Sequence, residues 1–202
     1  PHDLGRSDRD ARGDEGIPAA RRFRGDPLKD RPAPMDPLTL DDRTRLRPLA
    51  PADAGEVHDL ITRNRAHLDQ WLRWSSSIQS RADADALIAQ FEEKQARGDG
   101  FHLGIWVDGR LAGGCVCWSI HRQNRNAEIG YWLGADRTGR GLATRSAAAA
   151  IDHLIGRERL HRIEMQCAVD TRASRAIPER LGFRLEGIRR DSHWITHRFL
   201  DH

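Results

Sequence analysis

The sequence predicts an α/β fold of the α+β kind, in which helices flank a mixed, mostly antiparallel central sheet. Three observations support this prediction. Segments with apolar residues at helical spacing alternate along the chain with strand-like runs. Asp108-Gly109 separates two of these runs, which is typical of a β-hairpin. A turn with two glycines then joins a third strand-like run, residues 126–134, to an alanine-rich helix.

Residues 1–37 are expected to form a flexible tail, and residues 38–202 a single domain. Charges of both signs alternate in the tail, apolar side chains are few, and "GDPLKDRPAPMDP" contains four prolines. Such a segment buries too little apolar surface to offset the entropy that it loses on ordering. Met35 is a candidate for a natural start of the chain, an alternative that the sequence leaves open.

The domain is expected to begin with a strand and two helices. "RLRPL" at 45–49 alternates like a strand, and Asp53 is placed to cap the first helix. The apolar face of that helix would consist of Val57, Leu60 and Ile61. "SRADADALIAQFEEKQARGDG" predicts a second helix that stops at Gly98. Its inward residues would be Ala86, Leu87, Ala89 and Phe91.

The elements after the third strand follow from the same signals. We expect a helix over 141–155, a strand over 162–169, a helix over 172–182 closed by Gly182, and a last strand over 183–195.

Composition argues against several classes of protein. The net charge is +3, and no dense basic block with interleaved aromatic residues indicates nucleic-acid binding. No run of about 18 apolar residues predicts a membrane span, and the N-terminal residues lack the apolar core of a secretory signal. We therefore expect a cytoplasmic protein. Cys115, Cys117 and Cys167 are too few for a disulfide framework, and no motif has metal-ligand spacing, so no metal is expected.

The turn "GADRTGRGLATRS" has the composition of an anion site. A helix N-terminus leaves backbone N–H groups unpaired and carries a partial positive charge. Gly139 and Gly141 would let a ligand approach that backbone closely, as a pyrophosphate requires. The spacing is not that of a Walker A or a dinucleotide-binding motif. A plain loop before a helix is the alternative. The arginines of the turn are weak evidence, because only two of the 33 basic residues are lysines.

Three segments in order resemble the GNAT N-acetyltransferase superfamily, and more closely its subgroup that acetylates the N-terminal alanine or serine of ribosomal proteins. They are "AEIGYWLG", "RTGRGLA" and "ASRAIPERLGF", and "NRAHLDQWLRW" also matches the subgroup. The resemblance covers roughly residues 40–200. It departs from the family signature Q/R-x-x-G-x-G/A at Thr138, where glutamine or arginine is usual.

The resemblance implies acetyl-CoA as cosubstrate, held by backbone groups. Its pyrophosphate would lie on the amides of Thr138, Gly139, Arg140, Gly141, Leu142 and Ala143. Its pantetheine arm would pair with the edge of the strand that ends in "YWLG". The N–H near Leu133 would then stabilise the thioester oxyanion. Thr171 stands where the family often has an asparagine that contacts the cofactor.

The resemblance also implies catalytic roles for Glu128 and Ser174. Glu128, in a strand that is otherwise apolar, would act as general base through a water; an edge-strand glutamate paired with an arginine is the alternative. Ser174 would hydrogen-bond the CoA sulfur or protonate the leaving thiolate; a hydroxyl at a helix start is the alternative. Tyr131 is set aside as an acid because it lies inside the strand.

The acceptor site is expected near Trp71 and Trp74, which in the family's early helical segment would wall it. Packing in the core or in a lid is the alternative for two tryptophans so close together. The family usually has one more strand after the segment matching "HWITHRFLDH", and the sequence given ends at His202. The resemblance also makes a homodimer plausible.

The sequence therefore predicts an acetyl-CoA-dependent N-acetyltransferase whose acceptor is a primary amine, the N-terminal α-amine of a ribosomal protein. A protein α-amine has a pKa near 8 and needs only modest help from a base. Two alternatives remain open at this point. One is acetylation of a small amine, such as a polyamine or an aminoglycoside. The other is an acyl-CoA-binding module without catalysis.

Overall fold

The computed structural model describes residues 35–195 and 198–202. Its α-helices are α1 (Ala54–Arg63), α2 (Arg65–Leu68), α3 (Arg81–Arg97), α4 (Leu142–Gly156) and α5 (Arg172–Arg180). Its strands are β1 (Leu38–Thr39), β2 (Thr44–Pro48), β3 (Phe101–Val107), β4 (Arg110–His121), β5 (Asn126–Leu133), β6 (Arg162–Glu164), β7 (His193–Ile195) and β8 (Arg198–Leu200). Among these described residues, none belongs to a helix that is long and apolar enough to cross a membrane.

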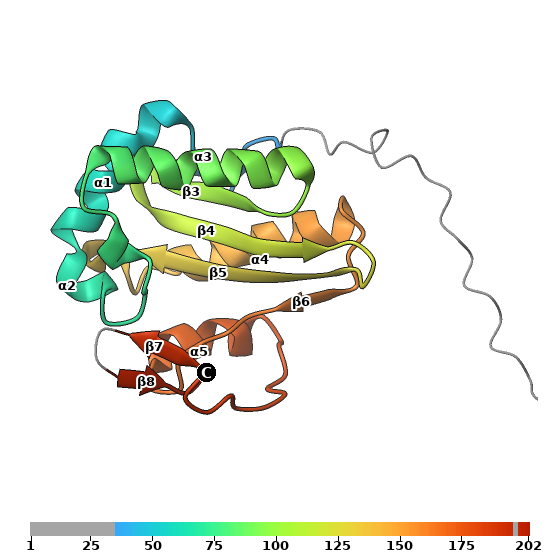
Figure 1. The fold of residues 1–202 in the computed structure, drawn as a ribbon. Helices are drawn as coiled ribbons and strands as arrows, with labels where there is room; N and C mark the ends of the chain where they lie inside the picture. Colours follow the sequence, from blue (N-terminus) through green and yellow to red (C-terminus); the bar gives the residue numbers. More distant parts are fainter. Residues whose placement is uncertain (1–34, 196–197) are drawn as a thin grey trace, which may run out of the picture. The chain divides into compact units, whose positions relative to one another are not determined.

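Six strands form one sheet in chain order, β1 to β6, and β7 and β8 form a separate pair (Figure 1). Every neighbouring pair in the sheet is antiparallel except β5 and β6, which are parallel. Helices α1 and α3 cover one face, and α4 covers the other (Figure 1). This arrangement confirms the predicted fold class, a mostly antiparallel mixed sheet flanked by helices.

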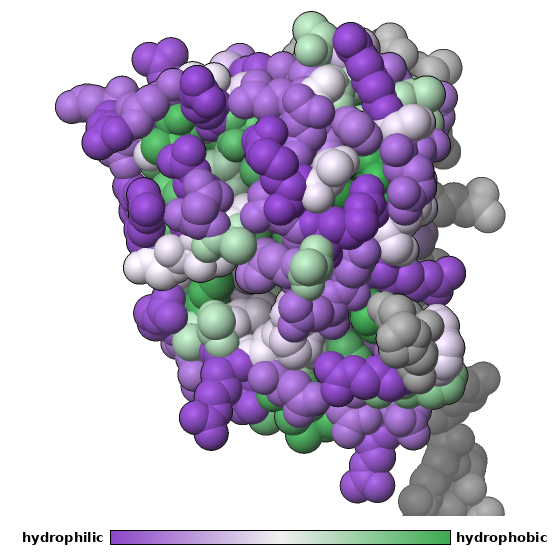
Figure 2. Space-filling view, turned by 90° about the vertical axis from the view of Figure 1, so that its left-hand side faces the viewer, coloured by the Kyte–Doolittle hydropathy of each residue, from purple (hydrophilic) through white to green (hydrophobic). Residues whose placement is uncertain are grey.

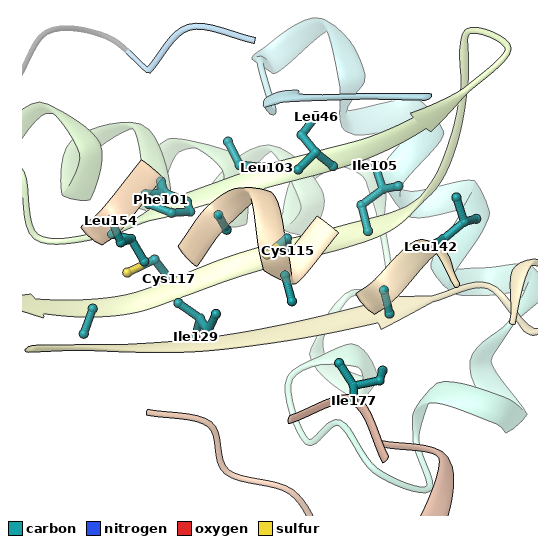
Figure 3. Close-up of a cluster of buried hydrophobic side chains, with 14 of the residues drawn as sticks. Leu46, Phe101, Leu103, Ile105, Cys115, Cys117, Ile129, Leu142, Leu154 and Ile177 are labelled. Carbon is teal, nitrogen blue, oxygen red and sulfur yellow. The ribbon is translucent and has the colours of Figure 1, made fainter. Parts of the chain in front are cut away.

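The larger core lies between the sheet and α4 (Figure 3). Alanines on the buried face of α4, such as Ala147 and Ala150, bring the helix close to the strands. The side chains of Leu103, Cys115 and Ile129 from three successive strands pack beneath it. Met35 belongs to the same cluster and is 7% exposed, so part of the expected 1–37 tail that the structure describes is packed. Residues 1–34 of that tail lie outside the described residues.

The second core lies between the sheet and helices α1 and α3. Val57, Leu60 and Ile61 are buried in it, as predicted. The predicted face of α3 was correct only at Phe91 and, half-buried, at Leu87. The fully buried residues at helical spacing from Phe91 are Ala84 and Ile88. Ala86 and Ala89 are exposed instead. Alanine is only weakly apolar, so five alanines distributed around this helix blur the periodic signal.

The hairpin between β3 and β4 forms at Asp108-Gly109, as predicted. Both residues have left-handed backbone angles, with φ of 51° and 74°, which the two-residue hairpin turn requires. The strand expected over 126–134 is β5, one residue shorter.

Two later strands are shorter than predicted. The strand expected over 162–169 pairs only as β6, because it has no neighbour beyond the three residues that face β5. Of the strand expected over 183–195, only His193–Ile195 pairs, as β7 with β8. Apolar spacing cannot show where a strand loses its partner.

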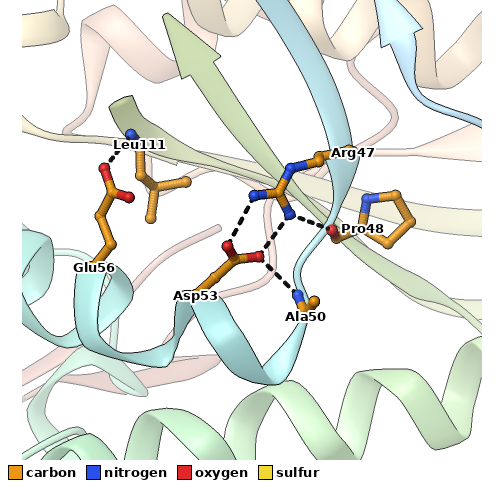
Figure 4. Close-up of polar contacts among 6 residues, drawn as sticks. All are labelled: Arg47, Pro48, Ala50, Asp53, Glu56 and Leu111. Atoms are coloured by element: carbon orange, nitrogen blue, oxygen red, sulfur yellow. Dashed lines mark hydrogen bonds and ion pairs between the residues drawn. The ribbon is translucent and has the colours of Figure 1, made fainter. Parts of the chain in front are cut away.

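Asp53 does not cap α1, which corrects the sequence prediction. Its carboxylate accepts hydrogen bonds from both terminal nitrogens of Arg47 at 2.6 and 2.8 Å, and from the Ala50 N–H at 2.8 Å (Figure 4). Arg47 lies at the end of β2 and its guanidinium also stacks over the ring of Trp106, at 4.0 Å from the centroid. The bidentate ion pair is stronger than the backbone cap that the sequence suggested. It ties β2 to the start of α1.

The substitution Asp53→Ala is expected to lower the free energy of unfolding by about 2 kcal/mol, because it removes charge-assisted hydrogen bonds and leaves the Ala50 N–H and the Arg47 guanidinium without their acceptor. Chemical denaturation measures the change. The control is Glu93→Ala, since the Glu93 carboxylate is 75% exposed in its pair with Arg97; its denaturation midpoint should not move. Equal effects of the two substitutions would contradict this account.

Candidate active site

The sheet opens where β5 and β6 stop pairing. Their parallel register joins Asn126 to Arg162, Ala127 to Ile163 and Glu128 to Glu164, and it ends there. Residues 129–133 of β5 continue for five residues with β4 on one side and with no strand among the described residues on the other. An unpaired strand edge presents a row of N–H and C=O groups. Such an edge can accept an extended ligand as an added strand.

The alternation of β5 determines which amides face this open edge. The Gly134 N–H donates to the Ala112 carbonyl of β4 at 2.9 Å. Because successive residues of a strand direct their N–H groups to opposite edges, the N–H groups of Leu133 and Tyr131 point away from β4. The N–H of Leu133, which the sequence analysis assigned to an oxyanion, therefore lies on the open edge.

The same strand leads into the glycine turn before α4. Gly139 and Gly141 have φ of 73° and 71°, in the left-handed region that side chains disfavour. A Cβ built on either glycine meets no atom within 4 Å, so open space lies in front of this backbone. The helical hydrogen bonds of α4 begin with the Arg145 N–H to the Gly141 carbonyl at 3.0 Å. The amides of residues 142–144 precede that bond and have no partner within the helix.

Side chains around the turn add positive charge to this helix end. A hollow of about 370 Å³ beside the turn is lined in part by Arg137, Arg140 and Arg145. Arg137 pairs with Asp136, and Arg145 pairs with Asp41, whose pKa it lowers to about 2. Arg140 makes no ion pair in the described part of the chain, so its charge is available.

Thr138 does not extend toward that space. Its hydroxyl donates to the carbonyl of Ala135 at 2.9 Å and closes the turn. Threonine thus holds the loop from within, at the position where a longer polar side chain is usual in the family that the sequence resembles.

Glu128 is half-buried and faces the side of β5 opposite to α4. Burial raises the pKa of its carboxyl group, and the neighbouring Glu164 carboxylate raises it further. Arg189 and a hydrogen bond from the Gln166 side chain act in the other direction. A carboxyl group with a raised pKa in a half-buried position is the kind of group that general bases use.

Ser174 lies in the first turn of α5 and meets two other side chains. Its Oγ is 3.4 Å from the Cys167 sulfur and 3.3 Å from the hydroxyl oxygen of Tyr131. The Tyr131 hydroxyl donates to the Ser174 carbonyl at 2.8 Å. Burial and the nearby Cys167 raise the pKa of Tyr131, so its hydroxyl keeps its proton. Ser174 does not cap its helix.

The structure separates the predicted catalytic residues into two groups. Glu128 points to the α1 and α3 face, whereas Tyr131, three residues later, points to the α4 and α5 face, where Ser174 lies. The open edge of β5 runs between the two groups. No hydrogen bond joins Glu128 to Ser174 in residues 35–195.

The remaining predicted site residues have structural contacts of their own. Trp74 stacks edge-to-face on Trp132, with ring centroids 5.5 Å apart, and belongs to the second core. Trp71 packs on the small apolar cluster of Ala168, Ile195 and Leu200, which anchors the β7–β8 pair. Both tryptophans are half-buried, so their packing role is observed and a wall for the acceptor stays a prediction.

Thr171 precedes α5 and donates from its hydroxyl to the Ala168 carbonyl at 2.6 Å. It fixes the turn before the helix.

Sequence reasoning missed Tyr131, Gln166 and Arg189. Tyr131 was set aside for lying inside a strand, yet its position at the open edge lets its side chain reach Ser174 across the gap. The two residues that act on Glu128 come from segments 38 and 61 positions away along the chain, so they become its neighbours only in the folded structure. Asn64, the first residue of the segment "NRAHLDQWLRW", has a clear role: its side chain accepts from the Ala135 N–H at 2.8 Å and so joins the end of α1 to the loop after β5.

The glycine turn yields a stability test. Gly141→Ala should lower the free energy of unfolding by about 1–2 kcal/mol, because an L-residue is strained at φ of 71°. Gly55→Ala, in the first turn of α1 with no atom within 4 Å of the new Cβ, should instead raise it by about 0.4–1 kcal/mol, because alanine lowers the entropy of the unfolded chain. Thermal and chemical denaturation of both variants check the opposite signs. A stabilised Gly141→Ala protein would contradict the observed turn.

Comparisons with known proteins agree with this geometry. The acetyltransferase (GNAT) domain family matches residues 43–184. YdaF of Bacillus subtilis (strain 168), provisionally named a ribosomal N-acetyltransferase, is 32% identical over 159 residues, which are 78% of this chain and 86% of that protein.

Two solved structures have the same fold. A ribosomal L7/L12 alpha-N-protein acetyltransferase in complex with coenzyme A aligns with a TM-score of 0.80 and 26% identity, covering 82% of this chain and 94% of its own. The microcin C7 self-immunity acetyltransferase MccE, in complex with acetyl-CoA and AMP, aligns with a TM-score of 0.76 and 26% identity over 80% and 90% of the two chains. With the open strand edge and the glycine turn in place, the chain belongs to the GNAT family of acetyltransferases.

Proposed function

We propose that this protein transfers the acetyl group of acetyl-CoA to the N-terminal α-amine of a ribosomal protein, by direct attack of the amine in a ternary complex. One observation carries the proposal: the open edge of β5 runs from Glu128 to the glycine turn. A single strand thereby joins a candidate base, the Leu133 N–H, which has no strand partner among the described residues, and the helix end at the glycine turn. Thioester aminolysis uses a base and a donor to the oxyanion, and the helix end is suited to the pyrophosphate of the donor.

The residues of the glycine turn fit acetyl-CoA. The space in front of Gly139 and Gly141 admits a ligand against the backbone, and the amides of the first turn of α4 can donate to a pyrophosphate. Arg140 adds an unpaired positive charge at the same place. Hydrophilic side chains cover most of the face that Figure 2 shows, which accords with a polar ligand on this protein. When bound, acetyl-CoA supplies the thioester.

The side chains at the open edge suggest how transfer proceeds. Glu128 accepts a proton from the acceptor amine through a water, and its raised pKa brings it closer to that of the amine. The Leu133 N–H donates to the oxyanion that develops from the thioester carbonyl. Ser174, on the other face of β5 and in contact with Tyr131, donates a hydrogen bond or a proton to the departing thiolate. The bond from nitrogen to the acetyl carbon forms as the carbon–sulfur bond breaks.

The two relatives with ribosomal names support a protein N-terminus as the acceptor. An α-amine is also easier to deprotonate than a lysine, by about 2–3 pKa units, which suits one half-buried carboxylate as base. Ribosomal proteins as acceptors would place the reaction in the cytoplasm.

A small molecule is the second candidate acceptor. The similarity to MccE, whose structure contains AMP beside acetyl-CoA, supports it. The two candidates predict different acceptors, peptides with a free N-terminus or small amines, and turnover on each can be measured.

With acetyl-CoA as donor, peptides with a free N-terminus are expected to release CoA thiol and to gain one acetyl group, whereas the same peptides with a blocked N-terminus and an internal lysine should not. A thiol reagent and mass spectrometry follow the two products. A second panel contains polyamines, aminoglycosides and amine-bearing nucleotides. Faster turnover on that panel would favour the small-molecule candidate, and no turnover on any amine would sink the enzymatic proposal.

Glu128→Gln is expected to lower kcat on the best acceptor about 10²–10³-fold while CoA affinity, measured by calorimetry, stays the same. The matched control is Glu179→Gln, an exposed carboxylate on α5, which should leave kcat unchanged. If Glu128→Gln retains full activity, Glu128 is not the base. If CoA binds and neither protein turns over, the chain is a binding module.

A further inference from the structure

Glu128 lies beside a second carboxylate that is held in place. Glu164 is its register partner on β6, so the two side chains leave the sheet on the same face. Arg162 donates to Glu164 at 2.7 Å and Asn126 donates to it at 3.3 Å. These contacts lower the pKa of Glu164, which therefore stays charged near neutral pH and opposes the charge of Glu128. The Glu164 carboxylate favours the protonated form of its neighbour.

A pair of polar side chains opposes this effect. The Nη1 of Arg189 donates to the Oε1 of Gln166 at 3.0 Å. With its oxygen occupied, the Gln166 amide has its NH₂ group left as the donor to the Glu128 carboxylate, whose pKa Gln166 lowers. An amide flip would place two donors together and is disfavoured. Arg189 therefore fixes Gln166 as a donor, and also adds its own positive charge near Glu128.

The neighbours of Glu128 on β4 carry no charge that could change its pKa. Ser119, its register partner, is uncharged, and Cys117, which lies in the core on the α4 side of the sheet, is neutral because burial raises its pKa to about 12. The charged neighbours within the described residues are thus Glu164 on one side and Arg189 on the other.

We propose that Gln166 and Arg189 are positioning residues, which aim the Glu128 carboxylate and favour its ionised form against the repulsion of Glu164. The proposal rests on the proposed function, in which Glu128 is the base. Arg189 does not touch the reacting atoms; it acts through its charge and through Gln166. Two opposing neighbours make the proton affinity of the base adjustable in both directions by single substitutions.

The test compares the acid limb of the pH profile of kcat/KM in four variants. Gln166→Leu and Arg189→Met should move that limb to higher pH by about half to one unit, because each removes a contact that favours the ionised carboxylate. Glu164→Gln should move it to lower pH by a similar amount. The control is Arg190→Met, next to Arg189 and exposed, with no hydrogen bond or ion pair among residues 35–195, which should leave the limb unmoved. A structural role alone would instead lower kcat/KM by the same factor at every pH.

A measurement without turnover separates this proposal from the proposed function. In protein with ¹³C-labelled glutamate, the Glu128 carboxyl resonance is identified by its loss in Glu128→Gln and then titrated in each variant. The proposal expects its pKa to rise in Gln166→Leu and Arg189→Met and to fall in Glu164→Gln. Unchanged or uniform shifts would overturn it, whatever the activity. If the pKa moves as expected while Glu128→Gln remains fully active, the positioning is confirmed and the base assignment fails.

Discussion

The arrangement of the candidate site depends on the point where two parallel strands stop pairing. Strands β5 and β6 pair over three residues and then separate. Up to that point the strands satisfy each other's backbone groups, and beyond it β5 keeps its full length because β4 holds its other edge through eight register pairs. The exposed N–H and C=O groups would be a liability in an ordinary sheet, where such an edge invites aggregation. Here the edge is the feature around which the glycine turn, the half-buried carboxylate and the tyrosine–serine contact are arranged.

The alternation of side chains along β5 places the candidate catalytic groups on opposite faces of the sheet. Glu128 and Tyr131 are three residues apart, so they leave β5 on opposite faces. In the proposed reaction, a base on one face and a proton donor on the other act on a group that passes between them. Each face of the sheet packs against its own core. One is the tryptophan-rich cluster under α1 and α3, and the other is the alanine-lined cluster under α4.

Local signals in the sequence predicted most elements, and long-range pairing accounts for what they missed. The Asp108-Gly109 turn and the left-handed glycines at 139 and 141 are set by backbone sterics, which are visible in a few residues. The ends of β6 and β7 are set by whether another strand lies alongside, which no short window contains. Asp53 shows the same limit, because Arg47 six residues before it outcompeted the helix end for its carboxylate.

The candidate site follows the same division. The resemblance indicated Glu128 and Ser174, whereas Gln166 and Arg189 became visible only when the sheet placed them beside Glu128. Their distance along the chain hides them from any motif.

An irregularity in β4 fixes the register of the neighbouring strand β5. The register of β4 against β5 shifts between Cys117 and Ser119, so the pairs on either side cannot slide past each other by one residue without breaking both. In β5, the loss of a single residue between Glu128 and Leu133 would exchange the two faces and send the tyrosine to where the carboxylate belongs. A substitution in this strand changes one side chain. A change in its length would move every side chain beyond that point to the opposite face of the sheet. The number of residues in β5 therefore matters as much to the proposed site as their identity.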